Sequence, residues 1–148
     1  MVETDGPVRG QAGRLIETRF GANQLLAFDA RAEGTGFTYG DGKTARFYVD
    51  GLGQPGNRLV WSVRGTEAAP VRVRLRYSTP DKTPPGRAVL RYGTTTLTAP
   101  LVATDGEKDL REVDLGLLPL AAGDLSDLSL TLEDAAKPVH VFDLRLER

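Results

Sequence analysis

The sequence has 148 residues, of which 19 are Lys or Arg and 20 are Asp or Glu, so its formal net charge is −1 at pH 7. This length is typical of one domain with its own core, and the charge argues against nucleic-acid binding, which depends on excess Lys and Arg. The absence of Cys excludes disulfides, thiolate catalysis and Cys-based zinc sites, and the short apolar runs predict no membrane-spanning segment.

The amino-terminal segment is polar and contains no signal-peptide pattern. We expect residues 1–13 to form a flexible tail and residues 14–148 to form a single domain. We also expect the first seven residues to be the trimmed start of a longer chain, from which any export signal has been removed.

Short segments with strand-like alternation follow one another along the chain. The segment 58–63 places Leu59, Trp61 and Val63 on one face. In the segment 70–77, four apolar side chains alternate with three arginines: Val71, Val73, Leu75 and Tyr77 against Arg72, Arg74 and Arg76. This pattern predicts an antiparallel strand with one buried face and one solvated face.

Three later segments show the same period. Their expected inward side chains are Ala88, Leu90 and Tyr92, then Leu128, Leu130 and Leu132, and finally Phe142, Leu144 and Leu146. Gly and Pro predict loops at 51–57 and 79–86, turns at 40–42 and 92–94, and a connection over 117–124. The fold class is therefore all-β, an antiparallel β-sandwich of the jelly-roll type with eight to ten strands.

Catalytic motifs are missing from the sequence. The sequence has a single His, His140, and no Gly-x-Ser-x-Gly nucleophile elbow with which it could form a catalytic triad. We expect His140 to be a packed side chain. The pairs Gly34/Gly36 and Gly51/Gly53 are isolated, and no helix follows them to receive a phosphate. We predict that the protein is not an enzyme, although its carboxylates leave a small hydrolase as a third interpretation.

Three segments together resemble carbohydrate-binding modules of families 6 and 35, which are galactose-binding-like β-sandwiches. The segment 47–63 reads FYVDGLGQPGNRLVWSV, the segment 75–77 reads LRY, and the segment 139–146 reads VHVFDLRL. They are similar, in the same order, to the family's G-Y/F-V-D-G stretch, its L-R-Y strand end and its last strand.

The resemblance also implies a structural calcium ion. Asp29 and Asp143 match two of the acids that hold it, whereas Arg31 stands where the family has a second acid. Calcium takes six to eight oxygen ligands. The alternative for both aspartates is that they accept hydrogen bonds from the backbone or from Arg.

The resemblance and the residue types suggest a sugar site. Trp61 has inward parity and is expected in the core, so the aromatic candidates are Phe37, Tyr39 and Tyr92. Arg76 matches an arginine that can touch the sugar in the family. Asp105 lies in the segment 104–111, where family members often have a Trp and this chain has no aromatic residue.

The arginines at 72, 74 and 76 leave two interpretations open. They can bind an acidic polysaccharide, or they can be balanced by acids on neighbouring strands. We predict a non-catalytic carbohydrate-binding accessory module of a larger extracellular or cell-surface protein, with a glycan and the parent protein's other domains as partners. The alternative is a structural or protein-interaction domain of an envelope or surface assembly that has lost sugar binding.

Overall fold

The computed structural model describes residues 14–16, 22–40, 48–135 and 137–147, and the predicted tail at 1–13 lies outside them. The strands are β1 (Arg14–Ile16), β2 (Ala22–Leu26), β3 (Arg31–Glu33), β4 (Thr38–Tyr39), β5 (Val49–Asp50), β6 (Arg58–Gly65), β7 (Ala69–Thr79), β8 (Arg87–Tyr92), β9 (Thr95–Pro100), β10 (Gly106–Leu120), β11 (Ser126–Glu133) and β12 (His140–Glu147). A single 3-10 turn, η1 (Ala27–Asp29), separates β2 from β3. Within the described residues, no helix could cross a membrane.

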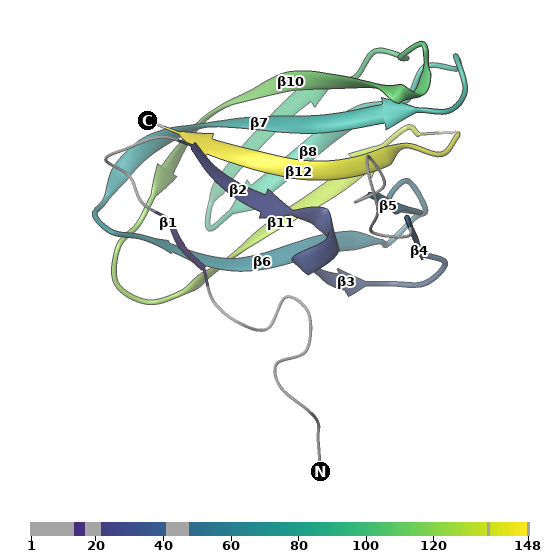
Figure 1. Ribbon diagram of the computed structural model, residues 1–148. Coiled ribbons are helices and arrows are strands. Elements are labelled where there is room, and N and C mark those ends of the chain that lie inside the picture. The colour runs from purple at the N-terminus through teal and green to yellow at the C-terminus, as the bar shows by residue number, and fades with distance from the viewer. Residues whose placement is uncertain (1–13, 17–21, 41–47, 136, 148) are drawn as a thin grey trace.

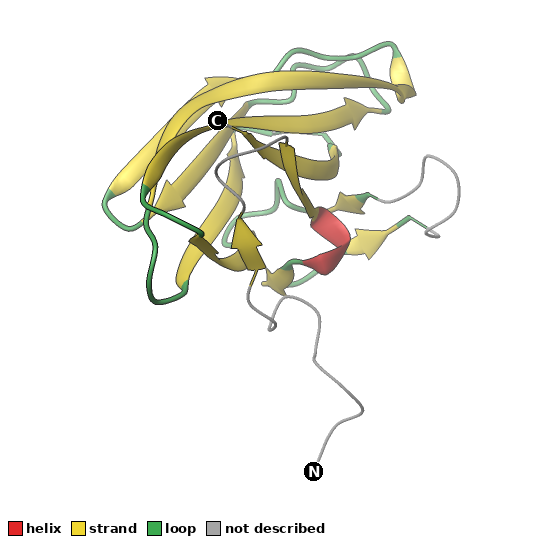
Figure 2. Ribbon diagram, turned by 60° about the vertical axis from the view of Figure 1, so that its left-hand side comes forward, coloured by secondary structure: helices red, strands yellow, loops and turns green. Residues whose placement is uncertain are grey.

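Two sheets pack face to face (Figure 1). The first has the order β1-β6-β11-β8-β9 with β3 also beside β6, and the second has the order β10-β7-β12-β5-β4 with β2 also beside β12. The turn η1 carries the chain from the second sheet to the first (Figure 2). Every pairing is antiparallel except that of β1 with β6. The predicted antiparallel β-sandwich is confirmed.

The described residues contain twelve strands rather than eight to ten. The difference comes from β1, β3, β4 and β5, which are only two or three residues long. Such short strands offer too few residues for an alternation pattern to be recognised in the sequence.

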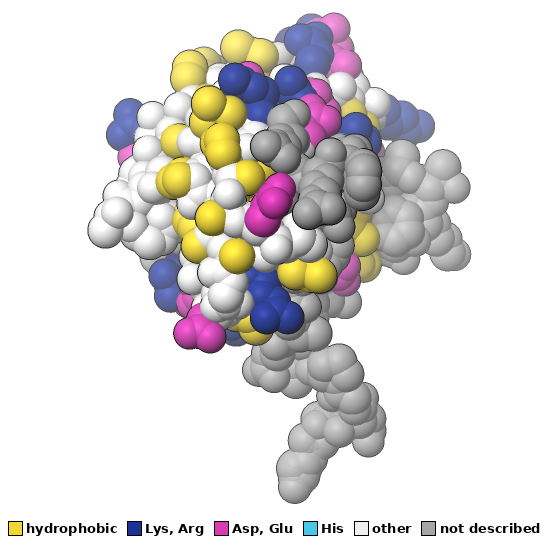
Figure 3. Space-filling model, turned by 90° about the vertical axis from the view of Figure 1, so that its left-hand side faces the viewer, with side chains coloured by type: hydrophobic (Ala, Val, Ile, Leu, Met, Phe, Trp, Pro, Cys, Tyr) yellow, Lys and Arg dark blue, Asp and Glu magenta, His cyan; other side chains and the backbone are white. Residues whose placement is uncertain are grey.

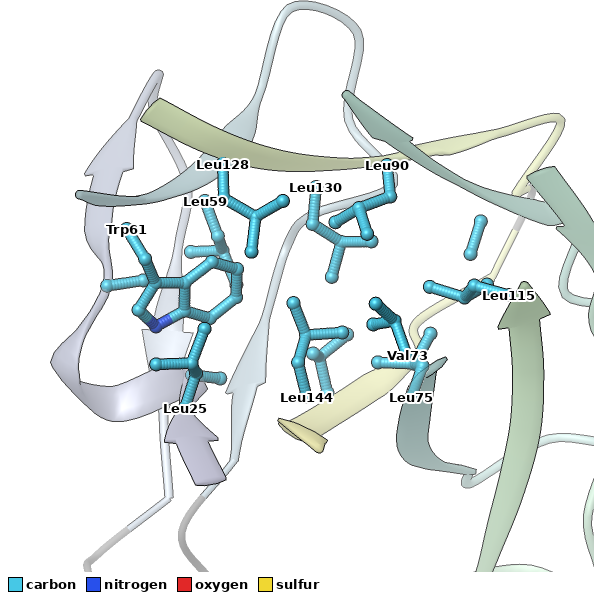
Figure 4. Close-up of a cluster of buried hydrophobic side chains, with 14 of the residues drawn as sticks. Leu25, Leu59, Trp61, Val73, Leu75, Leu90, Leu115, Leu128, Leu130 and Leu144 are labelled. Carbon is cyan, nitrogen blue, oxygen red and sulfur yellow. The ribbon is translucent and has the colours of Figure 1, made fainter. Parts of the chain in front are cut away.

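The core fills the space between the sheets with the side chains that the alternation predicts (Figure 4). Leu59, Leu128 and Leu130 of the first sheet face Leu75 and Leu144 of the second. Trp61 is also buried, as predicted, and its indole Nε1 donates a hydrogen bond to the Leu26 carbonyl at 2.9 Å. The indole therefore ties β6 to the end of β2 on the opposite sheet.

Two expectations for the carboxyl-terminal half were wrong. Residues 117–120 belong to β10 instead of a connection, and Pro119 lies opposite Pro70 of β7. Proline is tolerated there because β10 is an edge strand, paired only with β7. Phe142 departs from the inward alternation because a register shift falls between Val141 and Asp143, and its ring packs edge to face against Tyr48 with centroids 5.7 Å apart.

Candidate functional site

Loops from both sheets meet at the end of the sandwich near β4 and β5 (Figure 1). Asn57 joins two of them from a buried position. Its Nδ2 donates to the carbonyls of Thr35 at 2.6 Å and Gly51 at 2.9 Å, and its Oδ1 accepts from the Thr35 amide at 3.0 Å. Gly51 has a φ of +101°, and a Cβ there would come within 2.6 Å of the Gly36 carbonyl oxygen. The loops before β4 and β6 can approach this closely only with glycine at position 51.

A first hollow of about 370 Å³ opens between these loops and the connection before β12. It is lined by Gly36, Thr38, Asp50, Gly51, Gly53, Gln54, Pro55, Ala135, Lys137 and Pro138. Thr38 and Asp50 are opposite each other in the β4–β5 pair, and one carboxylate oxygen of Asp50 accepts the Gly51 amide at 2.7 Å. The hollow thus presents a carboxylate, a hydroxyl, an amide and an ammonium group, all of which can hydrogen-bond to a polar ligand.

A second hollow of about 480 Å³ lies beside the first, along the ends of β6 and β11. Its lining includes Arg58, Arg91, Thr131 and Glu133. Arg58 pairs with Glu33 at 2.5 Å, and Arg91 donates to the Thr131 hydroxyl at 3.2 Å and lies 3.8 Å from Glu133. Ion pairs therefore hold the two guanidinium groups at the sides of this hollow.

Gly53, Gln54 and Pro55 line both hollows, and we call this shared segment the 53–55 ridge. This 53–55 ridge belongs to the Gly-rich loop that the sequence predicts. The ridge is exposed at Gln54 and Pro55. A ligand longer than one hollow would therefore pass over these two side chains.

The predicted ligand residues do not line either hollow. Phe37 packs against the core, and Tyr39 is 39% exposed but packs edge to face with Phe28, with centroids 5.6 Å apart. Asp105 is exposed at the loop end of the sandwich, 4.0 Å from Lys82. The predicted candidates were mainly aromatic, whereas the structure brings together Asp50, Gln54, Lys137 and two arginines.

Tyr92 requires a correction, because it is only 6% exposed and belongs to the core. Its hydroxyl accepts the Ala121 amide at 3.1 Å, in the connection from β10 to β11. That connection lies at the opposite end of the sandwich from the hollows (Figure 1). Tyr92 is a structural residue.

His140 is a packed side chain, as predicted. Its ring stacks on Tyr48 with centroids 3.9 Å apart and planes 3° apart. Burial lowers the pKa of His140, while the charges of Asp50 and Glu107 oppose that shift. Among the described residues, the buried Nδ1 has no hydrogen-bond partner, so the neutral imidazole is the form that this environment favours.

The arginines on the outer face of β7 are paired with acids on both neighbouring strands. Arg72 contacts Asp114 at 2.7 Å, and Arg74 forms an ion pair with Glu147. Arg76 contacts Asp143. Of the two interpretations of this arginine series, the structure supports the balanced sheet face.

The contacts of Asp143, which is fully buried, and Arg76, which is partly exposed, bear on the implied calcium site. Arg76 Nε lies 3.0 Å from both carboxylate oxygens of Asp143, and its Nη2 donates to Oδ2 at 2.6 Å. Gln24 Nε2 donates to the same Oδ2, also at 2.6 Å. Asp29 lies exposed in η1, and the described residues contain no group of three or more His or acidic side chains placed to hold a metal. Asp29 and Asp143 therefore do not fit the implied site, because a guanidinium already occupies the place of a cation beside Asp143.

No protein-family model matches the chain, and no curated protein matches it. Several solved structures are similar to this chain. A family 35 carbohydrate-binding module from Clostridium thermocellum is 15% identical with a TM-score of 0.70, over 86% of this chain and 98% of the module. The chain thus shares the fold of this module, an antiparallel β-sandwich.

The same fold is similar to parts of two larger proteins. The GH26-CBM35 β-(1,4)-mannanase of Podospora anserina is 18% identical with a TM-score of 0.67, over 87% of this chain. The mosquito-larvicidal Cry4Aa toxin of Bacillus thuringiensis is 17% identical with a TM-score of 0.71, over 90% of this chain. The matched regions cover only 28% of the mannanase and 24% of the toxin. At these identities the similarity establishes the fold and leaves the ligand to the site itself.

Proposed function

We propose that this domain is a non-catalytic carbohydrate-binding module that holds a glycan in the two hollows flanking the 53–55 ridge. One observation carries the proposal: two open, adjoining, polar hollows lie at the loop end of a sandwich with this fold. Fixed polar groups that converge on a surface hollow are typical of a small-molecule site. The domain would serve as an accessory part of a larger secreted or cell-surface protein.

The chemistry of the hollows suits sugar hydroxyls. Asp50 accepts hydrogen bonds, Lys137 donates them, and Gln54 can do both. The described lining of both hollows contains no aromatic ring to stack on a sugar face. Recognition would therefore depend on hydrogen bonding along the ridge, and we expect modest affinity for each sugar unit.

Affinity electrophoresis tests this function. The probes are soluble β-1,4-mannan, β-1,3-galactan and alginate, which is acidic. Retardation by at least one polymer is expected, and Gln54→Ala or Lys137→Ala should weaken binding about 2- to 10-fold, since each removes about one hydrogen bond. The matched control is Lys108→Ala, because Lys108 is an exposed residue of β10 that lines neither hollow. Unretarded migration in all three gels would reject the proposal for these glycan classes, and equal effects of Lys137→Ala and Lys108→Ala would reject the site.

A separate observation supports the interaction-domain alternative. Leu15, Leu117 and Leu125 are exposed. They lie opposite Arg64 of β6, opposite Arg72 of β7 and in the β10–β11 connection, towards the end opposite the hollows. Figure 3 views that end and shows hydrophobic side chains gathered on it. Under this alternative, light scattering would show concentration-dependent association, which Leu117→Ser should weaken. A monomer at all concentrations would argue against self-association through this end.

A further inference from the structure

The carboxylate of Asp143 is fully buried, and at this position its strand β12 lies between β7 and β2. Asp143 lies in β12 directly opposite Arg76 of β7. On its other side, β12 pairs with β2, which contributes Gln24. A buried carboxylate is costly unless a cation and hydrogen bonds compensate it.

Arg76 supplies that cation. Its guanidinium makes three contacts of 2.6 to 3.0 Å with Asp143, and Gln24 adds a fourth hydrogen bond. Glu112 of β10 lies opposite Arg76 on the other side. The hydrogen bond to Asp143 raises the pKa of Arg76, burial opposes that shift, and the charges of Asp143 and then Glu112 add to the rise. A permanent positive charge is thus held between two carboxylates.

We infer that Arg76 is the internal cation of this domain: its guanidinium takes the structural role of a bound calcium ion, so the sandwich is stable without metal. A calcium ion needs six to eight oxygen ligands at 2.3–2.6 Å. Both oxygens of Asp143 instead accept N–H donors, and a second cation beside them would be repelled by the guanidinium.

The shape of the guanidinium matters as much as its charge. Arginine presents several N–H donors in one plane and can contact both oxygens of one carboxylate, whereas lysine presents a single ammonium. Arg76→Lys should therefore keep the charge but lose part of the stabilisation. Arg76→Gln should lose more, because it leaves an uncompensated buried carboxylate.

Thermal unfolding of the full chain tests the inference without any glycan, so its outcome is independent of the proposed function. The midpoint of the chelator-treated protein should not change when calcium chloride is added. Arg76→Gln should lower the midpoint by about 10 °C, and Arg76→Lys by about half of that. Arg76→Gln combined with Asp143→Asn should lower it by less than the sum of the single changes, because the two side chains act on each other.

The matched control is Arg74→Gln, one step along the same face. Arg74 pairs with Glu147, and both side chains are about one-third exposed, so this change should have little effect. A calcium-induced rise of the wild-type midpoint that a chelator reverses and Asp143→Asn removes would overturn the inference. An Arg76→Gln midpoint equal to that of Arg74→Gln would also overturn it. If Arg76→Gln does not fold, the Arg76→Lys midpoint and the wild-type calcium comparison still decide between the two outcomes.

Discussion

Asn57 joins two loops at the end of the sandwich where the hollows lie, and Asn57→Ala removes the three hydrogen bonds of its side chain. The side chain is 5% exposed and makes three hydrogen bonds with the backbone of Thr35 and Gly51. Each buried hydrogen bond contributes about 1 kcal/mol, so the substitution should reduce the free energy of unfolding by about 3 kcal/mol. With a urea dependence of about 2 kcal/mol per molar, the unfolding midpoint should fall by about 1.5 M.

Urea unfolding followed by fluorescence measures this change directly, because Trp61 is the only tryptophan in the chain and lies in the core. Gln54→Ala is the control: Gln54 is exposed on the ridge and should change the midpoint by less than about 0.3 M. The same two variants separate structure from binding. Asn57→Ala should weaken both stability and glycan retardation, whereas Gln54→Ala should weaken retardation alone. If the urea midpoint of Asn57→Ala lies within about 0.3 M of the wild-type midpoint, the role assigned to Asn57 is refuted.

Three further predictions concern stability alone and can be measured by the same urea titration. Gly86→Ala should cost about 2 kcal/mol or more, because φ is +83° and a Cβ would overlap the carbonyl oxygen at the end of β11; Gly93→Ala, at φ +59° in open space, should cost about 1 kcal/mol. Tyr77→Phe should cost about 1–3 kcal/mol, because the buried hydroxyl donates to a backbone carbonyl at 2.8 Å and accepts a backbone amide at 3.0 Å. Burial lowers the pKa of His140 below its ordinary 6.5, so at mildly acidic pH the unfolded chain binds more protons than the folded one. The free energy of unfolding should therefore decrease as the pH is lowered from about 7.5 to about 5.5, and it should decrease less steeply in His140→Phe. Equal costs at the two glycines, an unchanged Tyr77→Phe midpoint or identical pH slopes would each contradict the corresponding argument.

The sequence alone determines which side chains of the segment 70–77 face the core. In this segment Val71, Val73, Leu75 and Tyr77 point inward and the three arginines point outward, whatever the neighbouring strands are. Alternation is a local property of an extended chain, so it can be recognised from consecutive residues. The predicted loops at 51–57 and 79–86 are equally local, because Gly and Pro restrict the backbone where they occur, although Thr79 still belongs to β7.

Only the tertiary structure decides which outward side chains meet. Arg76 and Asp143 are 67 positions apart, and Asn57 reaches Thr35 across 22 positions. The hollows combine residues from β4, β5 and β11 with those of the connections before β6 and β12. The aromatic candidates were misleading for the same reason, since Tyr92 and Tyr39 are directed by their strand partners towards the core and Phe28. Strand order and register bring distant positions together, and a single sequence contains no local signal for either.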